Sequence, residues 1–172
     1  MKKTPLFYVI SAVALLGAAA PVRAAEPHLL SVHENWSAYS FQEDGHKVCY
    51  MASQPKKMGG AVDKRGEVFA LITDRPGENT HDVFSYIAGY TYKPGSDVTL
   101  TIDKDHFTLF TQDDTAWATD AAADGKITAA LRKGKVMTVK GTPAHGDTTT
   151  DTFELGGTDG AHKAIDQECG SP

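Results

Sequence analysis

Residues 97–111 read DVTLTIDKDHFTLFT. From Val98 to Ile102 every second residue is apolar and threonines stand between, which is the period of a strand with one buried face. The polar residues 103–105 are expected to form a turn, after which residues 106–111 return as a second strand. The stretch therefore predicts an antiparallel β-hairpin.

Similar short strands are predicted on both sides of this hairpin. Residues 67–74 are almost continuously apolar, which is typical of a strand buried on both faces. Residues 83–92 are similar, and the turn residues KPGS end that segment. The remaining strands are predicted as pairs around polar turns, at residues 36–41 with 48–53 and at residues 136–142 with 148–155.

Two segments have helical periodicity instead. In residues 124–133, Asp124 is a candidate N-cap and Gly134 ends the segment. Residues 158–168 place alanines and an isoleucine on one face. Regular short strands with so few helical residues predict a mainly β fold, an antiparallel sandwich or barrel with one short internal helix and a C-terminal helix. The longest expected loop is residues 55–66.

The N-terminus has the three zones of a signal peptide. Lys2 and Lys3 precede an apolar stretch at residues 6–20, and Val22-Arg23-Ala24 places small residues at the first and third positions before a cut. We therefore expect cleavage after Ala24. An uncleaved membrane anchor is the alternative, but the apolar stretch is shorter than the roughly 20 residues that span a bilayer.

The expected mature chain is small and acidic. Residues 25–34 are expected to be a flexible lead-in and residues 35–172 a single domain, large enough to bury a core. Removing residues 1–24 leaves 14 basic and 22 acidic residues, a formal net charge of −8. Such a chain lacks the basic stripe of a nucleic-acid-binding protein and the polybasic cluster that binds anionic lipid. No stretch after the signal peptide is apolar enough to span a membrane.

The two cysteines, Cys49 and Cys169, both lie in the mature region. In an oxidising compartment an even number of cysteines suggests a disulfide. They are 120 positions apart and neither has a second thiol nearby, which excludes a thioredoxin-like redox motif. Given export, we predict a disulfide between them; the alternative is two buried free thiols.

The sequence lacks familiar catalytic motifs. It contains no Gly-x-Ser-x-Gly nucleophile elbow and no glycine pattern for phosphate or dinucleotide binding. The seven histidines have no pair at the close spacing of a zinc site. We therefore predict no catalytic, cofactor-binding or metal-binding residues. The histidines are His28, His33, His46, His81, His106, His145 and His162.

Neighbouring carboxylates leave two chemical alternatives open. They could ligate calcium or cleave glycosides across a groove, but turn and helix-cap roles are the favoured interpretation. These carboxylates are Asp103 with Asp105, Asp113 with Asp114, and Asp120 with Asp124. Trp36 and Trp117 could be surface platforms for sugars, although the small neighbours of Trp117 favour a place in the core. Arg75 could bind an anion, but a structural salt bridge is favoured.

Several short motifs follow one another along the chain. They are CYMASQP at 49–55, TDRP at 73–76, AGY at 88–90, AWA at 116–118, KGKVM at 133–137 and TDTFELGG at 150–157, followed by Ala164-Ile165 and Cys169. In this order they resemble the invasion-associated locus B family of exported proteobacterial proteins, and the resemblance covers residues 36–169. Two departures are Asp147-Thr148, where a smaller residue is expected before the threonines, and the lack of extra N-terminal cysteines.

The resemblance implies an immunoglobulin-like β-sandwich in the periplasm or at the cell surface, and it supplies no catalytic residues to transfer. Two functional classes follow. The first is a non-catalytic binding or accessory module of the envelope, whose partner is an envelope or host protein. The second is an envelope hydrolase that uses Asp and His residues. A pocket that gathers such side chains favours the hydrolase, whereas a flat polar surface favours the binding module.

Overall fold

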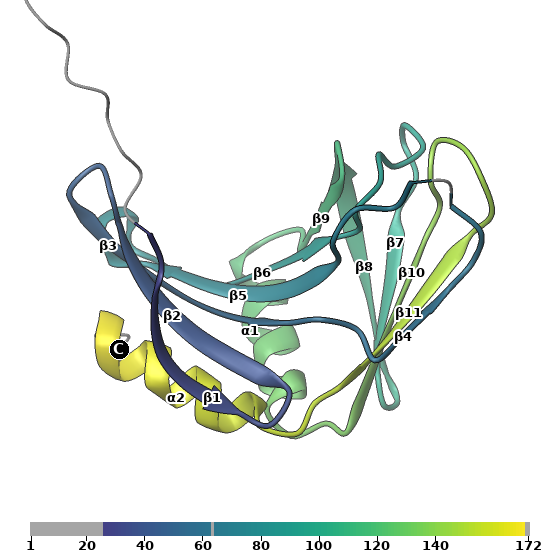
Figure 1. The fold of residues 1–172 in the computed structure, drawn as a ribbon. Helices are drawn as coiled ribbons and strands as arrows, with labels where there is room; N and C mark the ends of the chain where they lie inside the picture. Colours follow the sequence, from purple (N-terminus) through teal and green to yellow (C-terminus); the bar gives the residue numbers. More distant parts are fainter. Residues whose placement is uncertain (1–25, 63, 171–172) are drawn as a thin grey trace, which may run out of the picture.

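The computed structural model describes residues 26–62 and 64–170 (Figure 1), so the expected signal peptide lies outside the described residues. Within this part of the chain no helix is long and apolar enough to cross a membrane. The described elements are β1 (His28–His33), β2 (Trp36–Glu43), β3 (His46–Ser53), β4 (Lys57–Gly59), β5 (Phe69–Arg75), η1 (Pro76–Glu78), β6 (Thr80–Ile87), β7 (Val98–Ile102), β8 (Asp105–Gln112), β9 (Thr115–Trp117), α1 (Ala121–Leu131), β10 (Val136–Gly141), β11 (Thr149–Glu154) and α2 (Thr158–Cys169).

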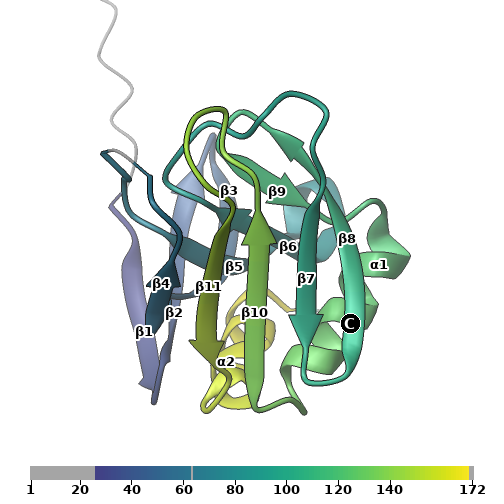
Figure 2. The same ribbon diagram turned by 90° about the vertical axis from the view of Figure 1, so that its right-hand side faces the viewer.

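The described strands form one antiparallel sheet that bends into two halves (Figures 1 and 2). The first half has the order β1-β2-β3-β5-β6-β9, and the second half has the order β8-β7-β10-β11-β4. The bend is at β8, whose residues 105–109 pair with β7 while residues 110–112 pair with β9. The predicted mainly antiparallel β fold with two helices is confirmed. The hydrogen-bonded ladder runs continuously through β8 from one half to the other.

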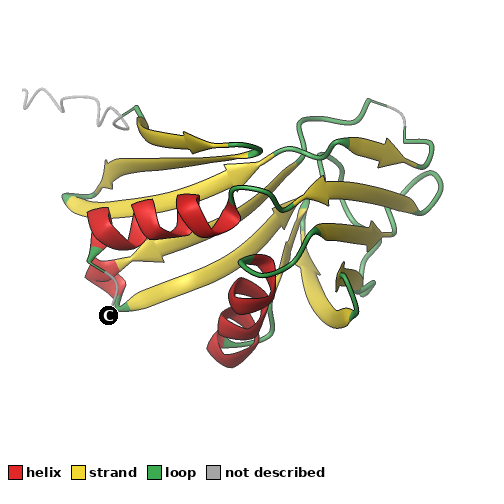
Figure 3. Ribbon diagram, turned by 90° about the horizontal axis from the view of Figure 1, so that it is seen from below, coloured by secondary structure: helices red, strands yellow, loops and turns green. Residues whose placement is uncertain are grey.

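The core lies on the inner side of the sheet. Along β2, β3 and β5 every second residue is buried, including Trp36, Met51 and Ile72. Both helices lie on this same side of the first half (Figure 3), and Ile165 of α2 belongs to the same buried cluster. The predicted disulfide between Cys49 of β3 and the last residue of α2 is confirmed. It fastens the C-terminal helix to the sheet.

A buried polar network joins the two halves. The guanidinium of Arg65 forms an ion pair with Asp151 of β11, and the hydroxyl of Tyr86 in β6 donates to the same carboxylate. The Asp151 side chain is fully buried and that of Arg65 is 12% exposed. The Tyr90 ring lies 5.1 Å from the guanidinium carbon, and the Tyr86 ring packs edge-on against Phe153. Burial and the hydrogen bond to Asp151 raise the pKa of Tyr86, so its hydroxyl stays a donor.

The lead-in expected at residues 25–34 contains a strand instead. β1 pairs antiparallel with β2. His33 lies opposite Trp36 at one end of this ladder, and His28 lies opposite Ser40 at the other end. A β-bulge at Leu30 breaks the period of two, so the segment lacks the alternation by which a strand is recognised in sequence. A second short strand, β4, lies within the predicted loop 55–66.

The internal helix begins three residues earlier than predicted. Asp120 is the N-cap of α1, because its carboxylate accepts a hydrogen bond from the backbone N–H of Ala123 at 2.8 Å. Asp124 is buried and accepts from the backbone N–H of Phe84 at 2.8 Å, which fixes α1 to β6. Burial raises the pKa of Asp124. Helix α2 follows its prediction and extends to Cys169.

The burial of both tryptophans differs from what the sequence suggests. Trp36 is fully buried and its indole N–H donates to the carbonyl of Glu154, so it is not a surface platform. Trp117, expected in the core, is only partly buried and lies on the other side of the sheet. Arg75 forms an ion pair with Glu43, in agreement with the structural role predicted for it.

Candidate functional site

The side of the first half that faces away from both helices is mainly apolar, and together with the end of β8 that pairs with β9 we call it the outer face. Directly opposed residues of an antiparallel ladder point to the same side of a sheet. The register therefore defines three rows of side chains on this face. They are Leu29, Tyr39, Tyr50, Thr73 and Val83; Val32, Ser37, Ala52, Leu71, Ser85, Trp117 and Phe110; and Phe69, Ile87 and Thr115.

Three apolar side chains of the outer face are strongly exposed. The exposed fractions are 48% for Leu29, 61% for Val32 and 44% for Phe110. These residues lie on β1 and β8, so the exposed groups stand at both ends of a surface that crosses seven strands. An exposed apolar area of this extent is typical of an interaction site.

Aromatic rings at the centre of the outer face pack against one another. Tyr39 and Tyr50 stack with 5.0 Å between ring centroids and 15° between ring planes, and Phe41 meets Tyr50 edge-on. Burial, and then the neighbouring Tyr39, raises the pKa of Tyr50. Each stacked ring covers a face of its neighbour, so this part of the surface is preformed and rigid.

The outer side of the second half has the opposite character. Its exposed and partly exposed rows consist mainly of threonines, with one lysine and one histidine, and a further pair joins Glu154 to Val136, which is 42% exposed. Valine, isoleucine and leucine occupy its inner side, as expected of a sheet with one face in water. The rows are Thr108, Thr99, Lys140 and Thr150, and His106, Thr101, Thr138 and Thr152. The apolar outer face of the first half is therefore not a general property of this sheet.

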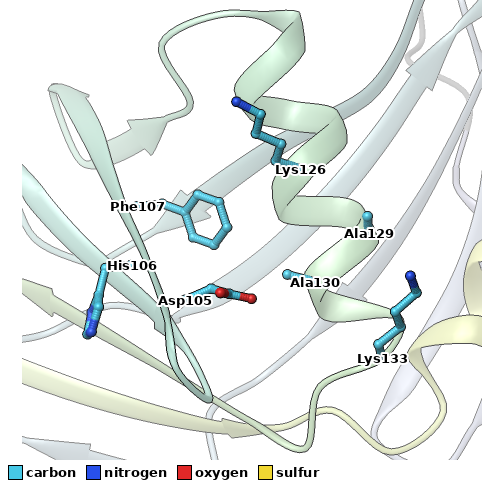
Figure 4. Close-up of a pocket in the computed structure, with 7 residues that line it drawn as sticks. All are labelled: Asp105, His106, Phe107, Lys126, Ala129, Ala130 and Lys133. Atoms are coloured by element: carbon cyan, nitrogen blue, oxygen red, sulfur yellow. The ribbon is translucent and has the colours of Figure 1, made fainter.

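An open pocket between β8 and α1 is lined by Asp105 and His106, two of the residues considered above for catalysis (Figure 4). Phe107 and Ala130 line it, and Asp105 points toward the helix. His106 points away, and its Nδ1 lies 3.0 Å from the hydroxyl of Thr101 on the threonine-rich side. Asp105 and His106 therefore do not converge on one point, as an acid–base pair must.

Other predicted carboxylates have structural positions. Asp103 accepts hydrogen bonds from the backbone N–H groups of Lys135 and Val136, both at 3.1 Å, and so links β10 to the preceding hairpin turn. Asp113 occupies a turn with a positive φ of 54°. Across residues 26–62 and 64–170 no group of three His, Cys, Asp or Glu side chains is placed to hold a metal ion.

His162 of α2 is the histidine with the strongest contacts to acidic groups. It is 4% exposed, its Nε2 lies 2.6 Å from Asp82 of β6, and its Nδ1 lies 2.9 Å from Asp166. The contact with Asp166 is an ion-pair contact without hydrogen-bond alignment. Burial lowers the pKa of His162, but Asp82 and Asp166 outweigh it and raise the pKa above its ordinary value, against a smaller opposing effect of Arg132.

We expect His162 to make stability depend on pH. Because the folded-state pKa is raised, protonated His162 stabilises the fold fully below its unfolded pKa of about 6.5, and this contribution is lost as pH rises through the folded pKa. The free energy of unfolding lost in His162→Gln should therefore be larger at about pH 5.5 than at about pH 8.5. Urea unfolding at both pH values measures it, with the exposed His106→Gln as control. Equal losses at both pH values would refute the ion-pair role.

The fold and the outer face define a disulfide-linked, mainly antiparallel β protein with an apolar sheet surface. The family model of the invasion associated locus B (IalB) protein matches residues 36–166. The chain therefore belongs to this family, as its motifs predict. A comparison with curated proteins finds no match.

A solved structure supports the fold. The chain is similar to the crystal structure of invasion associated protein B from Bartonella henselae, with a TM-score of 0.56 and 18% sequence identity. The similarity covers 80% of this chain and 95% of the Bartonella chain. At this identity the likeness establishes a shared fold.

Proposed function

We propose that this protein is a non-catalytic binding module of the bacterial envelope that contacts another protein through its outer face. The observation that carries the proposal is the contrast between the two halves of one sheet. Where the second half meets water its side chains are mainly threonines, with Val136 as an exposed apolar residue, whereas the outer face presents Leu29, Val32, Tyr39, Trp117 and Phe110. An apolar surface of this kind is stabilised when a partner removes it from water.

The chemistry of the outer face favours a protein partner over a glycan. A sugar ring stacks on the open face of an aromatic ring, but the Tyr39 and Tyr50 rings cover one face of each other and Trp117 is only partly exposed. The three rows themselves contain no charged residue, although Glu34 and Lys56 line an open hollow at their margin beside Tyr39 and Phe69. Arg75 at the end of the face is paired with Glu43. Binding should therefore rest on apolar burial, and its affinity should change little with salt concentration.

Export is part of the proposal. The Val22-Arg23-Ala24 pattern supports removal of residues 1–24, and the disulfide between Cys49 and Cys169 suits an oxidising compartment. We place the mature chain, beginning at Ala25, in the periplasm or at the cell surface. The intact mass of the protein recovered from the envelope fraction tests this start, and a chain that retains residues 1–24 would contradict it.

The partner in this proposal is an envelope or host protein. The family name and the name of the Bartonella relative both refer to invasion. These names support a host protein as one of the two kinds of partner. The divergent directions of Asp105 and His106 argue against an acid–base pair in the pocket between β8 and α1. For purified protein we expect no hydrolysis of peptidoglycan, peptides or esters. Turnover that is abolished by Asp105→Asn or His106→Gln would favour the hydrolase instead.

Site-specific photo-crosslinking in intact cells tests the surface. A photoreactive phenylalanine derivative placed at Phe110 on the outer face should give a discrete crosslinked product. The matched control places the same group at Thr99, which is exposed on the threonine-rich side of the second half. A product from Thr99 but not from Phe110 would contradict the proposed surface.

A further inference from the structure

The free edge of β1 is a second interaction surface at the margin of the outer face, to which its exposed side chains Leu29 and Val32 also belong. β1 pairs with β2, and none of the described residues pairs with its other edge. An unpaired edge presents backbone N–H and C=O groups to which another strand can bond. The opposite edge of the sheet, β4, has only three residues and includes Lys57, a residue type that blunts such edges.

The side-chain pattern of β1 is symmetric about its centre. His28, Ser31 and His33 are paired with Ser40, Ala38 and Trp36, which point inward. Leu30 packs against the core, so it also points inward. Leu29 and Val32 are paired with Tyr39 and Ser37 and point outward. From His28 to His33 the side chains therefore point inward, outward, inward, inward, outward and inward. This series of directions is the same when the strand is followed from either end.

The bulge at Leu30 creates this symmetry. In a regular strand, sides alternate at every residue, so positions 29 and 32 lie on opposite sides. The extra residue in β1 brings Leu29 and Val32 to the same side. A strand with such a pattern matches an antiparallel copy of itself at every position, which is the requirement of a two-fold interface.

We propose that a second copy of this chain pairs with β1 antiparallel, about a two-fold axis between Leu30 and Ser31. Leu29 then lies opposite the partner's Val32, and Val32 lies opposite the partner's Leu29. The two exposed apolar side chains of β1 become cross-strand pairs on a surface that continues the outer face.

The inner side of β1 has room for the partner strand. An open groove of about 510 Å³ runs between β1 and α2, and Leu30, Ser31, Gly160 and Ala164 are among the residues that line it. His33 of β1 packs against Gly160, and the longer side chains Lys163, Gln167 and Glu168 of α2 form the rest of the lining. The groove can receive the partner's Leu30 and Ser31, which point inward in the paired strand.

Sedimentation velocity of the mature protein over a wide range of concentrations tests the dimer. We expect a reversible monomer–dimer equilibrium. Val32→Lys should raise the dimer dissociation constant about tenfold or more, because it replaces an apolar pair by an ammonium group on each strand. Met58→Lys, a change on β4 at a side chain that is 62% exposed, should leave it unchanged. A monomer at every concentration, or loss of the dimer in Met58→Lys but not in Val32→Lys, would overturn the proposal.

Cysteine crosslinking tests the register, and it does not depend on the proposed function of the outer face. Mixed Leu29→Cys and Val32→Cys chains should form an intermolecular disulfide faster than either variant alone, because opposed Cβ atoms lie about 5 Å apart. Because of the bulge, Leu29 and Val32 have the two-residue spacing of Tyr39 and Ser37. The two Val32 positions of the two-fold pair are therefore diagonal neighbours, about 7–8 Å apart, which is too far for a disulfide with its Cβ separation of about 3.5–4.5 Å. Equal rates for mixed and single variants would refute this register.

Discussion

Replacement of Asp151 by asparagine is expected to lower the free energy of unfolding by about 3–5 kcal/mol, because removing one partner of a buried ion pair leaves the other charge uncompensated. In this variant the guanidinium of Arg65 still lies beside the Tyr90 ring but has no anionic partner. The Arg65 side chain is only 12% exposed, so water compensates its charge poorly. Urea unfolding followed by circular dichroism measures the loss.

A surface ion pair provides the control for this prediction. Glu43 pairs with Arg75 and is 45% exposed, so Glu43→Gln should cost only about 0–1 kcal/mol. A double-mutant cycle of Arg65→Met with Asp151→Asn should show strong coupling, since Arg65→Met removes the charge that Asp151→Asn leaves unpaired. A loss in Asp151→Asn no larger than that in Glu43→Gln would contradict the role of this network.

Removal of the disulfide is expected to have an effect of similar size. The Cys49–Cys169 bond closes a loop with a sequence separation of 120 residues, for which the chain-entropy model gives a stabilisation of about 5 kcal/mol. That is a large share of the roughly 5–15 kcal/mol by which a typical domain is stable. The variant Cys49→Ala with Cys169→Ala should therefore unfold at a much lower urea concentration.

Reduction of the unmodified protein checks the same bond without a change of sequence. Reductant should lower the melting temperature of the native chain but leave that of the double alanine variant unchanged. An equal shift in both would show that the reductant acts elsewhere. Alkylation of both thiols in denatured, unreduced protein would show that the bond does not form.

The sequence predicted most of the fold because local patterns specify most of it. The hairpin at 97–111 became β7 and β8, and the pairs at 36–53 and 136–155 became β2 with β3 and β10 with β11. The start of α1 was predicted less well, because an aspartate stands on each side of three alanines in residues 120–124 and either can be the N-cap. Asp124 is not the cap because its carboxylate binds the backbone N–H of Phe84, a contact that the sequence does not reveal. β1 was missed because its bulge removes the alternation.

The candidate site was harder to predict because it depends on which side of a sheet stays open. The nearly continuous apolar run at 67–74 predicts burial on both faces, yet in β5 only Ala70, Ile72 and Asp74 are buried, while Phe69 and Leu71 are partly exposed. An apolar residue that faces water looks the same in sequence as one that faces a second layer. The Arg65–Asp151 pair was likewise invisible, because its members are 86 residues apart and meet only when the sheet bends.

The central claim is that a partner covers the outer face in the cell, and hydroxyl-radical footprinting tests it most directly. The protein is labelled in intact cells and, at a matched radical dose, in purified form, and the oxidation of each side chain is compared by mass spectrometry. Met58, exposed on β4, is the internal reference. We predict that Tyr39, Trp117 and Phe110 are oxidised several-fold less in cells than in the purified protein, while Met58 is oxidised equally. Equal oxidation of all four residues in both samples would contradict the claim.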